Sequence, residues 1–143
     1  MAKTRADGNV CFVCGADNPA GLHVHFNMVG DTCRGEFTPG PLHGGFDGLC
    51  HGGILFSVLD DVMANWLFQQ GARGFTARCE IRYREPLPLG TPVRLEAHLV
   101  QRKRRLFMLA ASARRVDNGD LVAEAEAGFM VEDFGRLAEG SSA

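Results

Sequence analysis

The stretch HGGILFSVLDDVMANWLFQQ, residues 51–70, decides the fold. Its apolar residues recur every three to four positions, which is the period of one helix face and predicts a helix over about 52–70. The apolar arc takes up more than half of the circumference, so such a helix must be enclosed on several sides rather than laid on a flat surface. Two glycines open it, and two neighbouring carboxylates, Asp60 and Asp61, lie about two and a half turns along it.

Strand patterns flank this helix on both sides. Before it, alternating apolar and polar residues over 22–28 and a short segment at 33–37 predict two strands. After it, four strand-like segments follow at 76–84, 91–101, 105–115 and 121–132, with a hairpin turn signal at 117–120. Because the connections are short, we expect an antiparallel sheet. The predicted fold is α+β: a curved antiparallel sheet wrapped around one long central helix, which is the hotdog arrangement.

Length and composition fit one globular domain. The chain has 143 residues, 45% of them hydrophobic and 22% charged, so it can fill a single core over 1–143, with flexible tails at about 1–10 and 133–143. A net charge of −2 provides no general basic field for nucleic acid or an anionic membrane. No apolar run approaches the roughly 18–20 residues of a membrane span, and no secretory signal pattern follows the basic N-terminus. These features predict a cytoplasmic protein.

The cysteines do not indicate a disulfide framework, because their number is odd, five, and no secretory signal precedes them. Cys11 and Cys14 form a single C-x-x-C pair. A structural zinc site needs about four ligands, and only His23 or His25 would be available to complete one. No helix starts at the pair to lower a thiol pKa, which argues against a redox pair. We therefore interpret the pair as packing or turn structure and predict no metal site.

The start of the predicted helix can bind a carbonyl oxygen. Gly52 and Gly53 allow a ligand to approach the backbone closely. The first N–H groups of a helix have no intrahelical partner, and they lie at the positive end of the helix dipole. Together these features predict a site for a carbonyl oxygen or an oxyanion that needs no side chain.

Two adjacent carboxylates compete for a catalytic role. At about 100° per residue, Asp60 lies at the edge of the apolar arc, whereas Asp61 falls one step further round, near Ser57 and Asn65. We expect Asp60 to be the more buried and to be the leading catalytic candidate. We expect Asp61 to be solvated or bonded to Ser57 or Asn65.

The chain resembles the hotdog-fold acyl-CoA thioesterases, particularly the phenylacetyl-CoA thioesterase-like branch. The resemblance rests on CFVCGADNPAGL at 11–22, His-Gly-Gly at 51–53, the acid nine residues after that histidine, and the strand at 76–83 followed by Pro86 and Gly90. It extends from residue 11 to about 131. It implies a hydrolase that converts acyl-CoA to a free acid and coenzyme A, needs no cofactor, and works as a homodimer or homotetramer with its active site at a subunit interface.

The resemblance also implies roles for single residues. Asp60 corresponds to the acid that attacks the carbonyl or activates water, and Gly52 to the residue whose N–H polarises the thioester carbonyl. Thr76 corresponds to a hydroxyl contributed across the dimer interface. The family often carries a Gln or Asn six or seven residues before the histidine, where this chain has Gly45 and Gly44.

Further positions are candidates for contact with the substrate. His51 is expected to bond the backbone at the helix start, with substrate orientation as the alternative, and His43 is the nearest substitute for the missing loop amide. The basic run at 102–105 is either a solvated hairpin or a contact for the phosphates of coenzyme A, which suit Arg and Lys. The substrate-binding candidates are His43, His51, Gly53, Arg102, Arg104 and Arg105.

Two rival functions fit the same fold. A non-catalytic acyl-CoA-binding or sensing protein would explain the missing loop amide. A hydratase or dehydratase would require an acid and a histidine placed together as a dyad, which the sequence does not establish.

Overall fold

The computed structural model describes residue 5 and residues 7–137. One helix and six strands follow the N-terminal segment, in the predicted order. They are β1 (Phe26–Val29), β2 (Thr32–Phe37), α1 (Gly52–Phe68), β3 (Arg73–Tyr83), β4 (Val93–Lys103), β5 (Leu106–Arg115) and β6 (Leu121–Asp133).

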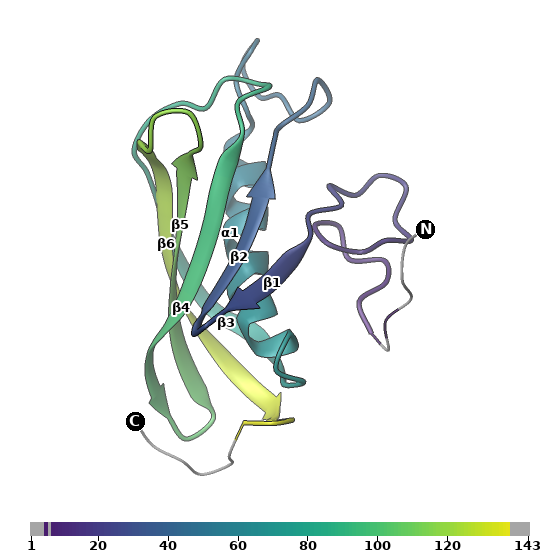
Figure 1. The fold of residues 1–143 in the computed structure, drawn as a ribbon, viewed down its shortest axis with the longest axis vertical. Coiled ribbons are helices and arrows are strands. Elements are labelled where there is room, and N and C mark those ends of the chain that lie inside the picture. Colours follow the sequence, from purple (N-terminus) through teal and green to yellow (C-terminus); the bar gives the residue numbers. More distant parts are fainter. Residues whose placement is uncertain (1–4, 6, 138–143) are drawn as a thin grey trace.

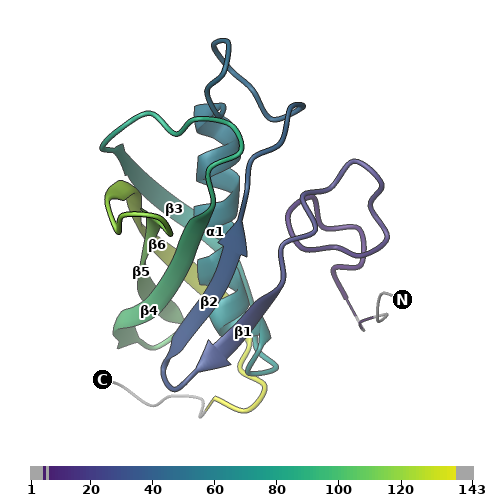
Figure 2. The same cartoon turned by 45° about the horizontal axis from the view of Figure 1, so that its top comes forward.

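The six strands form a single antiparallel sheet in the order β1-β2-β4-β5-β6-β3. The sheet curves around α1, which lies against its inner face (Figures 1 and 2). Because of this wrapping, the broad apolar arc of the helix is covered: Val58, Leu59, Val62 and Met63 have no exposed surface. The structure confirms the predicted α+β hotdog arrangement.

The first strand is shorter than the alternation of residues 22–28 predicted, because β1 begins only at Phe26. His23 adopts a positive φ of 55°, which is not compatible with strand backbone. The N–H of Val24 donates instead to the carbonyl of Val13 in the N-terminal segment, at 2.9 Å. The apolar side chains of this alternating segment therefore belong to a loop. Val24 in this loop is buried although it does not lie in a strand.

Part of the predicted C-terminal tail is packed against the body of the protein. Strand β6 runs to Asp133, and Phe134 is buried with its ring 6.1 Å from that of Phe107. The N–H of Arg136 donates to the carbonyl of Gln70 at 3.1 Å, which ties this segment to the end of α1. The remainder of the two predicted tails, residues 1–4, 6 and 138–143, lies outside the described residues.

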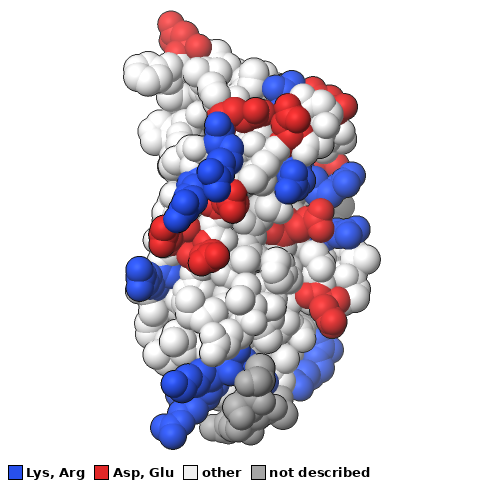
Figure 3. All heavy atoms as spheres, turned by 90° about the vertical axis from the view of Figure 1, so that its left-hand side faces the viewer, with Lys and Arg blue, Asp and Glu red and all other residues white. Residues whose placement is uncertain are grey.

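The outward side chains of the sheet carry charges of both signs. Arg34 and Glu96 lie 3.3 Å apart across β2 and β4, and Arg84 and Glu124 lie 2.9 Å apart near β3 and β6. Acidic and basic side chains are mixed over the upper part of the side shown in Figure 3, whereas its lower end carries basic side chains. In the part of the chain that the structure describes, no helix is long and apolar enough to cross a membrane.

Candidate active site

His51 caps the first turn of α1, which is the backbone-bonding role expected of it. Its backbone is extended, with φ −63° and ψ 134°, and its Nδ1 accepts a hydrogen bond from the N–H of Gly53 at 2.8 Å. The cap satisfies one of the free N–H groups of the helix start. Because this bond occupies Gly53, the expectation that Gly52 and Gly53 both hold a carbonyl oxygen is corrected. Among the described residues nothing accepts a bond from the N–H of Gly52, so Gly52 is the available donor.

Replacing His51 by Ala is expected to destabilise the protein by about 1 kcal/mol, because the cap on Gly53 N–H is lost. His51→Asn is the matched control, since an Asn side chain can cap the same position, and it is expected to restore most of the loss. The free energy of unfolding in urea measures both variants. Equal stability of His51→Ala and wild type would contradict the capping role.

The C-terminal end of β3 supports the helix start from the side. The Tyr83 hydroxyl donates a hydrogen bond to the carbonyl of Gly52 at 2.8 Å. A Cβ atom added at Gly52 would lie 3.4 Å from the Tyr83 ring, an ordinary contact. Tyr83 thus fixes the peptide that follows the candidate donor. No sequence spacing predicted this contact, because it joins residues 31 positions apart on different elements.

Asp60 meets Thr76 within the same chain. The Thr76 hydroxyl donates to Asp60 Oδ1 at 2.7 Å. The contribution of this hydroxyl across a dimer interface, which the resemblance implies, stays a prediction. The pairing of β3 with β6 shifts register between Thr76 and Arg78, and irregularities of this kind re-aim side chains locally. None of the described residues donates to the other carboxylate oxygen, Oδ2.

The surroundings of Asp60 favour its neutral form. Burial raises its pKa above the ordinary 3.8, and the hydrogen bond from Thr76 opposes that shift by stabilising the carboxylate. A carboxylate that is poorly hydrated is a stronger base and nucleophile than one in water. This arrangement suits a group that must take a proton from water or attack a carbonyl carbon.

Asp61 is more enclosed than the helical wheel predicted. Both carboxylates are half-buried, so the expected contrast between a buried Asp60 and a solvated Asp61 is wrong. The N-terminal segment covers Asp61, whose Oδ1 lies 3.6 Å from Cys11 Sγ. Asn65 donates to Asp61 Oδ2 at 3.1 Å, as the second alternative predicted, whereas Ser57 bonds the carbonyl of Gly53 at 2.8 Å. Asp61 therefore lies in a separate environment from Asp60.

The loop before α1 folds back onto the helix start. Its His43 accepts a bond from Gly40 N–H through Nδ1 at 2.8 Å, and the His43 carbonyl accepts from His51 N–H at 2.9 Å. A Cβ atom at Gly45 would lie only 3.2 Å from the Cα of His51. Glycine at this position therefore allows the close approach, and His43 is used to hold the loop. The loop and helix start line an open cavity of about 540 Å³ that includes Gly52.

The basic run at 102–105 lies at the β4–β5 turn, at the opposite end of the molecule from the helix start (Figure 1). The Arg102 guanidinium stacks over the Phe107 ring at 4.6 Å. Arg105 donates to the carbonyl of Val131 at 3.2 Å, and Arg104 is exposed with a φ of 58° in the turn. The fold of a single chain therefore does not bring these arginines to Asp60 or Gly52.

Asp60 and Gly52 are themselves too far apart to act on one carbonyl group within one chain. Eight residues separate them along α1, which at about 1.5 Å per residue is about 12 Å. Reacting atoms must approach to about 3–3.5 Å. One chain alone therefore cannot bring both groups to the same carbonyl.

Comparison with known proteins gives consistent matches. The family model of the thioesterase superfamily matches residues 47–122. The acyl-coenzyme A thioesterase THEM4 of Bos taurus is 30% identical over 97 residues, which cover 68% of this chain but only 40% of that protein. Among solved structures, protein RHA08564, a thioesterase superfamily protein, gives a TM-score of 0.79 at 27% identity, over 91% of this chain and 71% of that one. A hypothetical thioesterase from Streptococcus pneumoniae TIGR4, solved with coenzyme A, shares the fold with a TM-score of 0.72 at 18% identity, over 78% of this chain and 90% of that one.

Proposed function

Because the chain belongs to the thioesterase superfamily, we propose that it hydrolyses acyl-CoA thioesters to a free acid and coenzyme A. The observation that carries the proposal is the half-buried Asp60 carboxylate, whose Oδ1 is held by Thr76 at 2.7 Å. Its other oxygen is left to accept a proton from water or to attack the thioester carbon. The bovine relative is named an acyl-coenzyme A thioesterase, which supports the substrate class.

The proposed reaction divides the work between two groups. Asp60 either removes a proton from water, which then attacks the carbonyl carbon, or attacks that carbon directly to form an anhydride that water hydrolyses. The N–H of Gly52 donates to the carbonyl oxygen as negative charge develops on it. The carbon–sulfur bond then breaks, and the sulfur of coenzyme A leaves as the thiolate and takes up a proton. The groups on the protein need no cofactor for these steps.

A second copy of the chain completes the site in this proposal. The separation of about 12 Å between Gly52 and Asp60 requires that they come from different subunits. Strand β3 carries Thr76, and it pairs only with β6 within the described chain, so its other edge is open. Phe75 and Tyr83, on this strand, are half exposed. An open edge with exposed aromatic side chains favours a symmetric homodimer through β3. The homotetramer and the cytoplasmic location stay predictions.

Mixing two inactive variants tests the shared site. In a heterodimer of Asp60→Asn and Gly52→Pro chains, one site combines the intact Gly52 of the first with the intact Asp60 of the second. Random co-assembly is expected to recover about a quarter of wild-type activity, because half of the dimers are mixed and each has one intact site. The measurement is the turnover of the unselected co-expressed mixture, compared with that of each variant alone. A mixture as inactive as its parents would contradict a site shared between subunits.

The acid limb of the pH–rate profile is expected to report Asp60. As the pH is lowered, the Asp60 carboxylate takes up a proton and activity should fall. Because burial raises the pKa of Asp60, the midpoint of this fall should lie above pH 3.8. Thr76→Val removes the donor that lowers this pKa, so the acid limb should move to higher pH. Thr76→Ser keeps a hydroxyl and should leave the limb in place. Superimposable profiles of kcat/KM for Thr76→Val and wild type would argue against this coupling.

The activity itself is tested by thiol release across a panel of short, medium, long and aromatic acyl-CoA substrates. Turnover of at least one substrate is the expected result. Acyl-CoA binding without turnover of any substrate would instead favour a non-catalytic sensing protein. Gly44 and Gly45, which stand where the family often has a Gln or Asn, are consistent with that alternative.

A further inference from the structure

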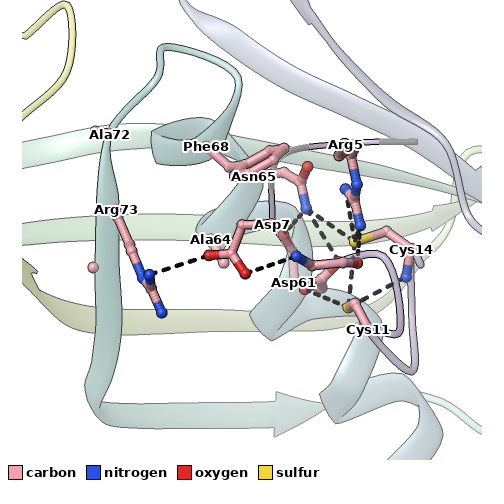
Figure 4. A pocket seen from close by; sticks show the side chains of 12 residues that line it. Arg5, Asp7, Cys11, Cys14, Asp61, Ala64, Asn65, Phe68, Ala72 and Arg73 are labelled. Carbon is pink, nitrogen blue, oxygen red and sulfur yellow. Dashed lines mark hydrogen bonds and ion pairs between the residues drawn. The ribbon is translucent and has the colours of Figure 1, made fainter. Parts of the chain in front are cut away.

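Cys11, Cys14 and Asp61 form a compact cluster between the N-terminal segment and α1, on a different side of the helix from Thr76. Figure 4 shows the three side chains converging at the edge of a cavity of about 170 Å³. The two Sγ atoms are 3.3 Å apart, and Asp61 Oδ1 lies 3.6 Å from Cys11 Sγ. His23 does not take part, because its Nε2 contacts the carbonyl of Asn18 at 2.6 Å. The third potential ligand beside the two cysteines is thus Asp61. The spacing of residues in the sequence did not associate it with the cysteine pair.

The spacing of these three atoms fits a small tetrahedral ion. Zn–S bonds of about 2.3 Å and a Zn–O bond of about 2.0 Å in tetrahedral geometry place the sulfurs about 3.8 Å apart and each sulfur about 3.5 Å from the oxygen. The observed distances are 3.3 Å and 3.6 Å, and all three ligand atoms lie within 4.8 Å of one another. An outward movement of about 0.5 Å by one thiol would bring the two sulfurs to the tetrahedral separation.

The ligand set of the cluster also suits a divalent cation. Such an ion stabilises thiolates and a carboxylate that lie within 4.8 Å of one another. The place already attracts positive charge: the guanidinium nitrogens of Arg5 lie 3.6 Å and 3.7 Å from Cys14 Sγ.

A neighbouring amide fixes the carboxylate in the orientation that a metal ligand needs. Asn65 is buried, and its amide nitrogen donates to Asp61 Oδ2 at 3.1 Å and to the Asp61 carbonyl at 3.0 Å. The Asn65 oxygen in turn accepts from Gln69 at 3.2 Å. Oδ2 is therefore engaged while Oδ1 faces Cys11. Partners of this kind orient the ligands of metal sites.

We propose that Cys11, Cys14 and Asp61 bind one thiophilic divalent cation, Zn²⁺, with water as the fourth ligand. The two thiols lose their protons to solvent as the two Zn–S bonds form, and Arg5 moves away from Cys14. The ion fastens the N-terminal segment to α1 beside Asp60. Soft sulfur ligands select zinc over magnesium or calcium, which prefer oxygen. A Cys11–Cys14 disulfide is the competing state, but its formation would require an oxidant.

Cobalt binding to the reduced full-length protein tests the proposal, because Co²⁺ reports its own ligands. Titration with Co²⁺ is expected to give one tetrahedral site per chain, with a sulfur-to-cobalt charge-transfer band of two-thiolate intensity. Zn²⁺ should bleach this band and raise the melting temperature of the protein. A band without thiolate character, or no binding below millimolar Co²⁺, would overturn the proposal. So would a Cys11–Cys14 disulfide that persists under reductant.

Variants identify the ligands. Cys11→Ser, Cys14→Ser and Asp61→Asn are each expected to weaken Co²⁺ binding by more than about tenfold, and the two serine variants should also halve the charge-transfer intensity. Cys50→Ser is the matched control, because Cys50 lies outside the cluster, and its titration should equal that of wild type. Circular dichroism separates loss of ligand from loss of fold. Unchanged binding in folded Cys11→Ser or Asp61→Asn would assign the ion elsewhere.

Discussion

Replacing Asp60 by Asn is expected to lower kcat for acyl-CoA hydrolysis by about 10²–10⁴-fold, because an amide neither takes a proton from water nor attacks the carbonyl. The Asn side chain keeps the shape of Asp and can still accept the hydrogen bond from Thr76. Thiol release from the best substrate of the panel gives the measurement. Asp61→Asn is the neighbouring comparison and should cause a much smaller loss. A loss of activity confined to Asp61→Asn would show that Asp61, and not Asp60, is the catalytic carboxylate.

The same variant should not be less stable than wild type. Because the folded pKa of Asp60 is raised above 3.8, the folded protein holds this proton to higher pH than the unfolded chain does. The stability associated with Asp60 is therefore full below pH 3.8 and is lost as pH rises through the folded pKa. At neutral pH the ionised group costs stability, and Asp60→Asn removes that cost. Urea unfolding at neutral pH distinguishes an inactive folded variant from an unfolded one.

Replacing Gly52 by Pro is expected to lower kcat by about 10²–10³-fold, because it removes a single N–H donor from the developing oxyanion. Proline is tolerated at the first position of a helix, where no intrahelical bond is lost. The preceding residue, His51, already has the extended backbone that proline requires. The hydrogen bond from Gly53 N–H to the capping His51 side chain is not altered by the change.

Gly52→Ala is the matched control for this prediction. It adds a Cβ atom at ordinary contact distance from Tyr83 but keeps the N–H group, so it should retain most of the activity. Comparing kcat for the two variants isolates the contribution of one backbone donor. Equal activity of Gly52→Pro and Gly52→Ala would place the oxyanion contact elsewhere.

The sequence predicted those features that follow from local periodicity. The helix and its enclosure on several sides follow from the spacing of apolar residues in 51–70, and the strands of the sheet follow from the patterns that flank it. The cap at His51 was likewise predictable, since it involves residues two positions apart. Each of these features lies within one element or its nearest neighbours.

The features that the sequence did not reveal depend on long-range contacts. A helical wheel cannot show that the segment of Cys11 covers Asp61, because 50 residues separate the two. The contact between Tyr83 and Gly52 is of the same kind. Arg102 illustrates a further limit: a basic run indicates charge, but only the fold shows that its guanidinium packs over Phe107.

The sheet order has a consequence for synthesis on the ribosome. Strand β3 ends at Tyr83, but its partner β6 is the last strand of the described residues and ends at Asp133. At about 5–20 residues per second, translation needs about 3–10 s to supply the missing strand. During that interval α1 has emerged without the full sheet that covers its apolar arc, and β3 has both edges open. The nascent chain therefore completes this sheet only after β6 has been made, and a ribosome stalled before β6 presents an incompletely covered apolar helix to chaperones.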